Sequence, residues 1–258
     1  MDLSNSINPR LGAAPWPGRF HGRVILVTGG AGGLGGSATE RLRAEGAIVV
    51  KTDIAIAEDR LEDDHAELAL DVTDPERWAQ VVATVVERYG RIDGLLMGHG
   101  SQGPEALVED VPREGWTRTL NINLDSCFYG LQAVMPTMKA QRYGRIAVLS
   151  SIAGREGNAS MTAYSVSKAG VIALVKSVAK EVAPEGIVVN AVAPSMFDTP
   201  LLAHLSPERN AMLLSRVPMG RVGYPPEFAA LAAWLLSPEC SYTTGQTLDL
   251  TGGRYSGA

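Results

Sequence analysis

Tyr164 and Lys168 lie four residues apart in the segment AYSVSKAGVIALVKSVAKEVA, which has the composition of a helix. Four residues is just over one helical turn, so both side chains are expected to project from the same face. A phenol normally loses its proton near a pH of about 10, but a neighbouring ammonium group stabilises the phenolate and lowers that pKa. The pair is therefore predicted to exchange a proton with an alcohol or carbonyl oxygen near neutral pH.

Two serines precede this helix at a position where ligands bind. Ser150 and Ser151 close the apolar run from Ile146 to Leu149, which is typical of a strand. In an open parallel sheet, the carboxyl end of a strand is the ligand-binding edge. A surface pair of tyrosine and lysine, with serines that only cap a strand, is the simpler alternative. The nucleotide-binding features at the start of the chain favour the catalytic interpretation.

A glycine-rich turn follows the first apolar segment. Residues 23–28 (RVILVT) are typical of a parallel strand covered on both faces, and TGGAGGLGG and the helical stretch SATERLRAEG come next. Glycines let the backbone approach a pyrophosphate closely, and the helix presents free N–H groups to the anion. The pattern G-x-G-x-x-G fits at Gly30, Gly32 and Gly35. A tight turn alone would also explain glycines, but a strand before and a helix after favour a dinucleotide site.

Asp53 ends the second predicted strand, AIVVKTD, eighteen residues beyond Gly35. A carboxylate at this point accepts hydrogen bonds from the adenosine ribose hydroxyls and repels a 2′-phosphate. Neither the glycine loop nor Ile54 and Ala55 supplies a cation for such a phosphate. NAD is therefore favoured over NADP. Lys51 shares a strand face with Asp53; it is expected to point away or to pair locally.

The composition indicates one globular α/β domain. The 258 residues are 45% hydrophobic, and the formal net charge of −5 gives no reason to expect binding to nucleic acid or to an anionic membrane. The two cysteines, Cys127 and Cys240, have no metal or disulfide spacing, so no metal site is expected. The run from Phe228 to Leu236 is too short to span a bilayer, and no signal pattern is evident. A soluble cytoplasmic protein is predicted, with an N-terminal arm over residues 1–22 and a single domain over residues 23–258.

Two further motifs agree with a known family. The pattern T-G-x-x-x-G-x-G fits at Thr28, Gly29, Gly33 and Gly35, and Tyr164 and Lys168 form a Tyr-x-x-x-Lys motif. With these motifs in order from about Arg23 to Gly253, the chain resembles the short-chain dehydrogenase/reductase family. The resemblance implies a doubly wound Rossmann α/β fold, a single domain with a seven-stranded parallel sheet, and a homo-oligomer, either a tetramer or a dimer.

The resemblance also implies four catalytic residues. Tyr164 is the general base in oxidation and the general acid in reduction, and Lys168 lowers its pKa and binds the nicotinamide ribose. Ser151 polarises the substrate oxygen. Asn123 supports a proton relay; it matches the family position better than Asn121, and an asparagine inside a helix otherwise has little reason to be there.

Cofactor-binding positions carried over from the family run from the glycine loop to the segment after the sixth predicted strand. Asp71 and Val72 match the pair that contacts the adenine; for Asp71 the alternative is a cap for the helix predicted over residues 75–89, a role that Asp74 fills equally well. The full set of predicted NAD contacts is Gly29, Gly33, Leu34, Gly35, Asp53, Asp71, Val72, Gly98, Gly100, Tyr164, Lys168, Pro194, Phe197 and Thr199.

The chain departs from the family in two places. Where relatives usually have Asn-Asn-Ala-Gly, it has Met97-Gly98-His99-Gly100, and Ser195 replaces a usual glycine after Pro194. His99 is either a substrate contact or a hydrogen-bonded, space-filling residue. Residues 201–217 resemble a mobile substrate lid. The candidate substrate contacts are His99, Arg155, Asn158, Ser195 and His204.

The predicted function is reversible, NAD-dependent oxidation of a secondary alcohol to a carbonyl by direct hydride transfer. The substrate is a small molecule: a sugar, polyol, hydroxy acid or cyclic alcohol. One alternative is a ketoreductase like the 3-oxoacyl-carrier-protein reductases, which share these motifs but usually prefer NADP. The other is a non-catalytic NAD-sensing protein; such proteins typically lose the tyrosine or the lysine, and both are present here.

Overall fold

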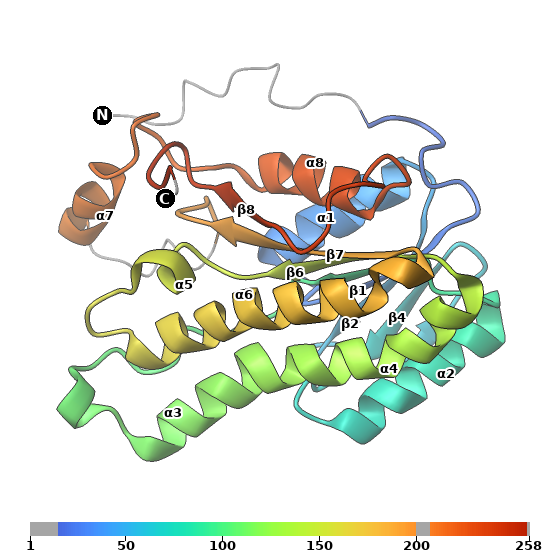
Figure 1. Cartoon of the computed structure of the whole chain (residues 1–258), viewed down its shortest axis with the longest axis horizontal. Helices are drawn as coiled ribbons and strands as arrows, with labels where there is room; N and C mark the ends of the chain where they lie inside the picture. The colour runs from blue at the N-terminus through green and yellow to red at the C-terminus, as the bar shows by residue number, and fades with distance from the viewer. Residues whose placement is uncertain (1–14, 200–206, 257–258) are drawn as a thin grey trace.

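The computed structural model describes residues 15–199 and 207–256 of the chain, and within them the strands form one sheet between two layers of helices (Figure 1). The strands are β1 (Val24–Thr28), β2 (Ile48–Asp53), β3 (Arg60–Leu61), β4 (His65–Ala69), β5 (Gly94–Met97), β6 (Gly144–Leu149), β7 (Ile187–Pro194) and β8 (Thr247–Leu250). The α-helices are α1 (Gly33–Ala44), α2 (Pro75–Tyr89), α3 (Arg113–Leu120), α4 (Ser126–Gln141), α5 (Ala153–Glu156), α6 (Thr162–Val182), α7 (Pro207–Leu214) and α8 (Pro225–Leu236). Shorter turns are the 3-10 segments η3 (Val108–Asp110) and η5 (Ala183–Glu185) and the π-helical turn η4 (Asn121–Asp125).

The strand order is β3-β4-β2-β1-β5-β6-β7-β8. Seven of these strands pair in parallel, as the sequence predicted, and the two-residue β3 adds an antiparallel edge to β4. From β1 the chain first builds toward β4 and then crosses back to β5, so the connections diverge between β1 and β5. In a doubly wound sheet this switch point opens a crevice at the carboxyl ends of the strands.

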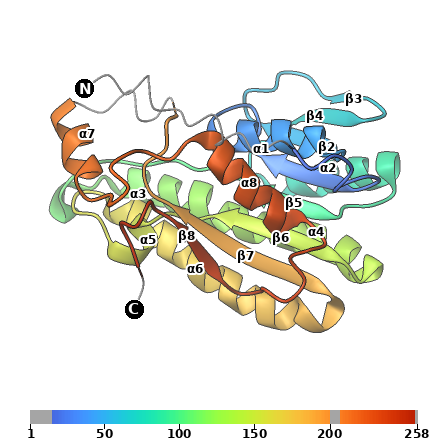
Figure 2. The same ribbon diagram turned by 90° about the horizontal axis from the view of Figure 1, so that it is seen from above.

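Each face of the sheet is covered by its own helices (Figures 1 and 2). On one face, α2, α4 and α6 enclose a core that contains Trp78, Leu131 and Val175. On the other, α1 and α8 pack together around Leu42 and Phe228. Because both faces are covered, the central strands are continuous apolar runs without alternation, and all five residues of β1 are buried.

Local signals in the sequence set the helix ends. In α2, Asp74 is the N-cap and its carboxylate accepts a hydrogen bond of 2.9 Å from the backbone N–H of Arg77. Pro75 occupies the first turn, where its missing N–H costs nothing, and Gly90 ends the helix with a φ of +77°. The predicted bounds of this helix, residues 75–89, are confirmed.

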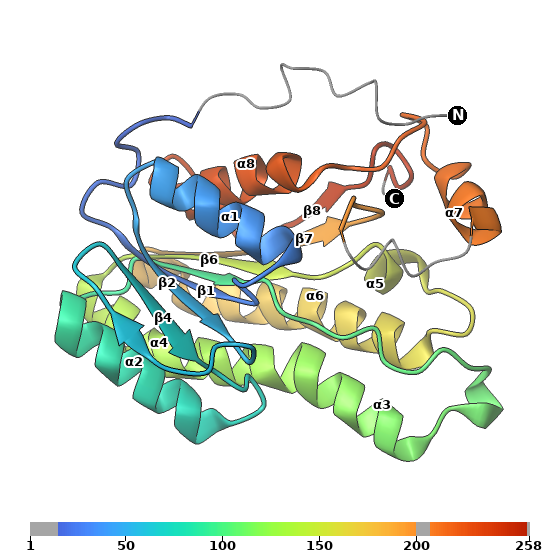
Figure 3. The ribbon, with the colours of Figure 1, turned by 180° about the vertical axis from the view of Figure 1, so that it is seen from behind.

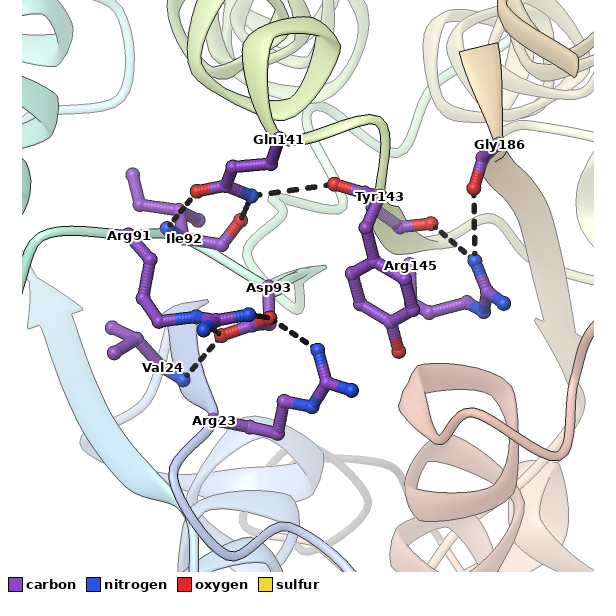
Figure 4. Close-up of polar contacts among 10 residues, drawn as sticks. Arg23, Val24, Arg91, Ile92, Asp93, Gln141, Tyr143, Arg145 and Gly186 are labelled. Atoms are coloured by element: carbon purple, nitrogen blue, oxygen red, sulfur yellow. Dashed lines mark hydrogen bonds and ion pairs between the residues drawn. The ribbon is translucent and has the colours of Figure 1, made fainter. Parts of the chain in front are cut away.

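The edge of the sheet that lies opposite the switch-point crevice carries a polar network (Figure 4). The Asp93 carboxylate, 1% exposed, accepts hydrogen bonds from the guanidinium groups of Arg23 and Arg91 and from the backbone N–H of Val24. The guanidinium carbons of Arg23 and Arg145 lie 4.4 and 4.5 Å from the ring centroid of Tyr143. These contacts tie β1, β5 and β6 together where the strands begin.

At the other end of the molecule, α5, α7 and the start of α6 lie near the carboxyl ends of β6 and β7 (Figure 3). Of the residues predicted to do chemistry, Tyr164 and Lys168 lie in α6, and Ser151 follows β6. Among the described helices, none is long and apolar enough to cross a membrane.

Candidate active site

Helix α6 presents Tyr164 and Lys168 at the end of β6. The lysine Nζ donates a hydrogen bond of 2.7 Å to the carbonyl of Leu149, the last residue of β6. It lies 5.9 Å from the centroid of the Tyr164 ring. The four-residue spacing therefore places both side chains on the face of the helix that meets the crevice.

The ionisation of this pair differs from the sequence-based prediction. Burial raises the pKa of the Tyr164 hydroxyl above its ordinary value, and a hydrogen bond with Ser151 offsets only part of that rise. Burial also lowers the pKa of Lys168 to about 8. The predicted lowering of the tyrosine pKa is not seen in this arrangement, because burial of the phenol has the larger effect.

The two serines after β6 have different partners. The Ser150 hydroxyl donates a hydrogen bond of 2.8 Å to the backbone carbonyl of Lys168 and joins the strand to α6. The Ser151 hydroxyl, 7% exposed, accepts one of 3.1 Å from the backbone N–H of Ala153 and also contacts Tyr164. Of the two, Ser151 is the one that lies beside the phenol.

Asn123 lies in η4, a widened turn between α3 and α4. It is fully buried, and its side-chain amide bonds to both backbone groups of Ser101, the Oδ1 accepting from N–H and the Nδ2 donating to C=O, at 2.8 Å each. A Cβ at Gly100 would lie 3.3 Å from both the Asn123 Oδ1 and the Lys168 Nζ. Asn123 therefore adjoins the lysine, and π-helical turns of this kind often occur at functional sites.

Ser101 and Ser167 belong to this network and were not predicted. The Asn123 Nδ2 donates to the Ser167 hydroxyl at 3.0 Å, and that hydroxyl in turn donates to the backbone carbonyl of Tyr164 at 2.7 Å. Ser167 thus links Asn123 to the helix that carries the tyrosine. The position of Ser167 inside the Tyr-x-x-x-Lys segment was the only available signal for it.

The glycine loop after β1 leaves no room for side chains on its inner side. A Cβ at Gly35 would lie 2.2 Å from the Gly29 carbonyl oxygen, and one at Gly98 would lie 2.9 Å from the Thr28 carbonyl oxygen. By contrast, a Cβ at Gly32 or Gly33, at the start of α1, would meet nothing within 4 Å. This open, side-chain-free helix N-terminus fits the pyrophosphate of a dinucleotide.

Asp53 lies at the end of β2 beside this loop. Its carboxylate accepts hydrogen bonds from the backbone N–H groups of Ala31 and Ala55, at 3.1 and 3.0 Å. Lys51 pairs with Glu67, with 2.5 Å between Nζ and Oε1, which is the local pairing that the sequence predicted. The Lys51 ammonium group is therefore already paired with the Glu67 carboxylate.

The remaining predicted cofactor positions are spread along the same edge of the sheet. Asp71 follows β4, and its carboxylate accepts from the Thr73 backbone and hydroxyl, whereas Asp74 caps α2. Leu34 and Val72 are partly buried against the two cores. Pro194 ends β7; Phe197 is buried against the α8 side of the core, and the Thr199 hydroxyl donates to its carbonyl at 3.4 Å.

Two predicted substrate contacts have their polar groups bound inside the protein. The His99 ring lies between two hydroxyls, with Nδ1 2.6 Å from Thr28 Oγ1 and Nε2 2.7 Å from Ser126 Oγ. The Ser126 hydroxyl donates to the Ile122 carbonyl, so it accepts from Nε2–H, and burial lowers the pKa of His99 to about 3. The ring is neutral and joins β1, β5 and α4. These contacts favour the space-filling alternative.

The Arg155 guanidinium is also bound by groups of the protein. Its guanidinium lies 3.2 Å from the Asp249 carboxylate of β8 and donates a hydrogen bond of 3.0 Å to the Thr247 carbonyl. The Ser195 hydroxyl donates to the Thr251 carbonyl at 3.2 Å, and Asn158 lies in the partly buried loop before α6. His204 falls outside the residues that the structure describes.

Comparisons with known proteins show the family of this chain. The family model described as enoyl-(acyl carrier protein) reductase matches residues 29–254. A 2-dehydro-3-deoxy-L-rhamnonate dehydrogenase (NAD(+)) of Sphingomonas sp. (strain SKA58) is 40% identical over 241 residues, covering 92% of this chain and 97% of that protein. A 3-oxoacyl-[acyl-carrier-protein] reductase FabG of Thermotoga maritima is 40% identical over 243 residues, covering 91% and 98%.

Solved structures show the same fold. The crystal structure of gox2181 superposes with a TM-score of 0.85 at 32% identity, covering 92% of this chain and 96% of the other. That of levodione reductase gives a TM-score of 0.85 at 31% identity, covering 91% and 98%.

Proposed function

This chain belongs to the short-chain dehydrogenase/reductase family and is an oxidoreductase that acts on CH–OH groups; from that premise we propose that it oxidises a secondary alcohol reversibly with NAD. The observation that carries the proposal is the convergence of Ser151, Tyr164 and Lys168 at the end of β6, beside a glycine loop with room for a pyrophosphate. The bound nicotinamide supplies the hydride acceptor.

The chain's own residues handle the proton and the substrate oxygen. Tyr164 takes the proton from the alcohol in oxidation and returns it in reduction, and Ser151 holds the same oxygen by a hydrogen bond. Lys168 holds a positive charge next to the developing phenolate, because its pKa of about 8 leaves it mostly protonated at neutral pH. The hydrogen bond between Asn123 and Ser167 holds η4 against α6 beside the lysine.

The other proposed dinucleotide contacts follow the carboxyl edge of the sheet. Gly29, Gly33, Leu34 and Gly35 would hold the pyrophosphate, and Asp53 the adenosine ribose. Asp71 and Val72 would flank the adenine. Gly98, Gly100, Pro194, Phe197 and Thr199 would line the nicotinamide half.

A sugar-derived hydroxy acid is the substrate class that we favour. The 2-dehydro-3-deoxy-L-rhamnonate dehydrogenase (NAD(+)), named for a deoxy sugar acid, is 40% identical to this chain and covers 92% of it. A screen of sugar acids, polyols and cyclic alcohols, followed by NADH absorbance, tests this choice.

The second candidate is a ketoreductase that acts on acyl groups held on a carrier protein. Several relatives at 36–40% identity carry the name 3-oxoacyl-[acyl-carrier-protein] reductase. Turnover of an acetoacetyl thioester with NADPH that exceeds every NAD-linked oxidation would favour this candidate. A protein that binds NADH but turns over no compound of either panel would instead be a sensor.

Replacing Tyr164 with Phe tests the catalytic assignment. Without the phenol the alcohol has no proton acceptor, so turnover is expected to fall by roughly 10²–10⁴-fold, while NADH still binds with nearly unchanged affinity. Initial rates and a fluorescence titration measure the two quantities. Tyr242→Phe, at a fully exposed position, is the matched control and should change neither. Undiminished turnover in Tyr164→Phe would refute the assignment.

Comparing NAD with NADP tests the role of Asp53. Like charges about 4 Å apart near a protein surface repel by about 1–4 kcal/mol, so kcat/KM should favour NAD by at least about fivefold. Asp53→Asn keeps the size of the side chain but removes the charge, and it should narrow that preference. A parent enzyme that prefers NADP would overturn the cofactor proposal.

A further inference from the structure

Helix α5 connects two residues of the proposed site. It begins two residues after Ser151, whose hydroxyl accepts from the Ala153 N–H at 3.1 Å and whose carbonyl accepts from the Gly154 N–H at 3.0 Å. A Cβ at Gly154 would lie only 2.6 Å from the backbone carbonyl carbon of Lys168, so α5 packs directly on the backbone of α6. A helix of four residues is not stable by itself and needs outside contacts to keep its place.

Two ion pairs supply those contacts at the far end of α5. Arg155 of the helix reaches Asp249 of β8, with 3.2 Å between Nε and Oδ1. In the second pair the helix supplies the acid: the Nη2 of Arg254, in the C-terminal segment, donates to the Oε2 of Glu156 at 2.7 Å. The Arg254 side chain is only 4% exposed, so its charge depends on Glu156 far more than in a surface pair.

The segment that carries Arg254 is itself held in a tight turn over residues 251–255. The Arg254 N–H donates to the Thr251 carbonyl at 3.2 Å, and the Tyr255 N–H donates to the Thr251 hydroxyl at 3.3 Å. On its other side, the Gly252 carbonyl accepts from the Met219 N–H at 3.1 Å. The turn therefore has fixed contacts both with α5 and with the segment that follows α7.

We propose that Arg254 and Glu156 are positioning residues that hold Ser151 beside Tyr164 through α5. The proposal rests on the proposed function, because the position of the serine matters for a reaction at Tyr164. The C-terminal turn is then part of the enzyme's machinery although it touches no reacting atom. Loss of the Arg254–Glu156 pair frees α5 to shift, and the Ser151 hydroxyl shifts with it.

Arg254→Gln is the test variant, with Arg254→Lys as the conservative rescue and Arg88→Gln as the matched control. Arg88 pairs with Asp63 at the surface, far from α5. Three quantities are measured: amide hydrogen exchange of a peptide over residues 151–157, kcat with KM, and NADH affinity. In Arg254→Gln, the amides of residues 151–157 should exchange faster than in the parent. The kcat should fall about tenfold or more, since displacing a catalytic group by about 1 Å can lower the rate by up to about 100-fold. NADH affinity should stay unchanged.

Arg254→Lys should recover most of the protection and of kcat, and Arg88→Gln should match the parent. Exchange that is unchanged in Arg254→Gln overturns the proposal, and so does faster exchange with an unchanged kcat. If Arg254→Gln does not fold, Glu156→Asp replaces it. This variant keeps both charges but shortens the acidic side chain and so weakens the contact, and smaller changes of the same kind are expected. Should the parent turn over no alcohol, the proposed function fails, and the exchange of residues 151–157 still decides whether the pair holds α5.

Discussion

Lys168 is a buried amine that donates a hydrogen bond to the Leu149 carbonyl. Burial disfavours its charged form, so the folded protein binds this proton less tightly than the unfolded chain does. Where a buried group must be charged to do its work, the fold loses stability for the sake of function. The effect has a defined pH range, which makes it measurable.

Lys168→Met removes the titrating group at nearly constant size. Between pH 8 and 10.5 the unfolded parent is protonated at this position and the folded parent is not, so the parent's unfolding free energy should rise with pH relative to that of the variant. The full difference is about 3 kcal/mol. Urea unfolding of both proteins without dinucleotide, at intervals from pH 7 to pH 10, measures it. Parallel stability curves would contradict the shifted pKa.

The residues of the site differ in how far the sequence could predict them. Spacing alone predicted that Tyr164 and Lys168 share a helix face, and a strand followed by two serines predicted their neighbours. The direction of the shift in the tyrosine pKa could not be predicted, because it depends on how deeply the folded chain buries the phenol and on its hydrogen bond with Ser151. The partners of His99 lie 71 and 27 residues away in the chain, and no local pattern indicates them.

Among the elements, α2 and α4 pack against each other at a glycine. A Cβ at Gly130 would lie 2.8 Å from Cη2 of Trp78, and that indole is fully buried in the core. The helices meet at this distance only because Gly130 has no side chain. Gly36 in α1 is different, since a Cβ there would be in ordinary contact, 3.6 Å from the Gly30 carbonyl oxygen.

Gly130→Ala should therefore lower the unfolding free energy by about 1–3 kcal/mol through overpacking. Gly36→Ala is the matched control: it should raise stability by about 0.5–1 kcal/mol, because alanine loses less backbone entropy in a helix. Thermal unfolding followed by circular dichroism measures both, at roughly 2–4 °C per kcal/mol for a domain of this size. Equal shifts in the two variants would contradict the packing argument.

The order and type of the elements could be predicted because apolar runs indicate the strands and helices, and glycine or proline residues mark where they begin and end. Asn123, predicted to lie inside a helix, lies in η4, which joins α3 and α4. Its widened turn arises from contacts of Asn123 with Ser101 and Ser167, which are tertiary and leave no periodic signal. The two-residue β3 is too short for any pattern to indicate it.

For the molecule as a whole, stability and chemistry lie at opposite edges of the sheet. The Asp93 network holds the strands together where they begin, and the tyrosine, lysine and serine lie where they end. Burial raises the pKa of the Asp93 carboxyl, but hydrogen bonds from Arg91, Val24 and Arg23 outweigh it, and the net pKa is lowered. Its stabilising effect is thus present above the unfolded value of about 4 and is lost as the pH falls through the folded pKa.

Asp93→Asn should lower the unfolding free energy by about 2–3 kcal/mol at pH 7, since it removes charged acceptors from two arginines. The difference from the parent should shrink as the pH falls below about 4. At a temperature where both proteins are folded, kcat should be the same. Asp63→Asn, whose carboxylate is 99% exposed, is the matched control and should cost almost nothing. A large loss of kcat in Asp93→Asn would contradict the separation of the two edges.

The π-helical turn at Asn121–Asp125 has a consequence for how this chain can vary. One extra residue in a helical turn rotates everything beyond it by about 100° relative to an unbroken helix. Deleting any one residue there would turn either α3 or α4 onto a wrong face, whereas most single substitutions would leave that phase intact. Among proteins that descend from this sequence, the length of this segment should therefore vary less than the identity of its residues.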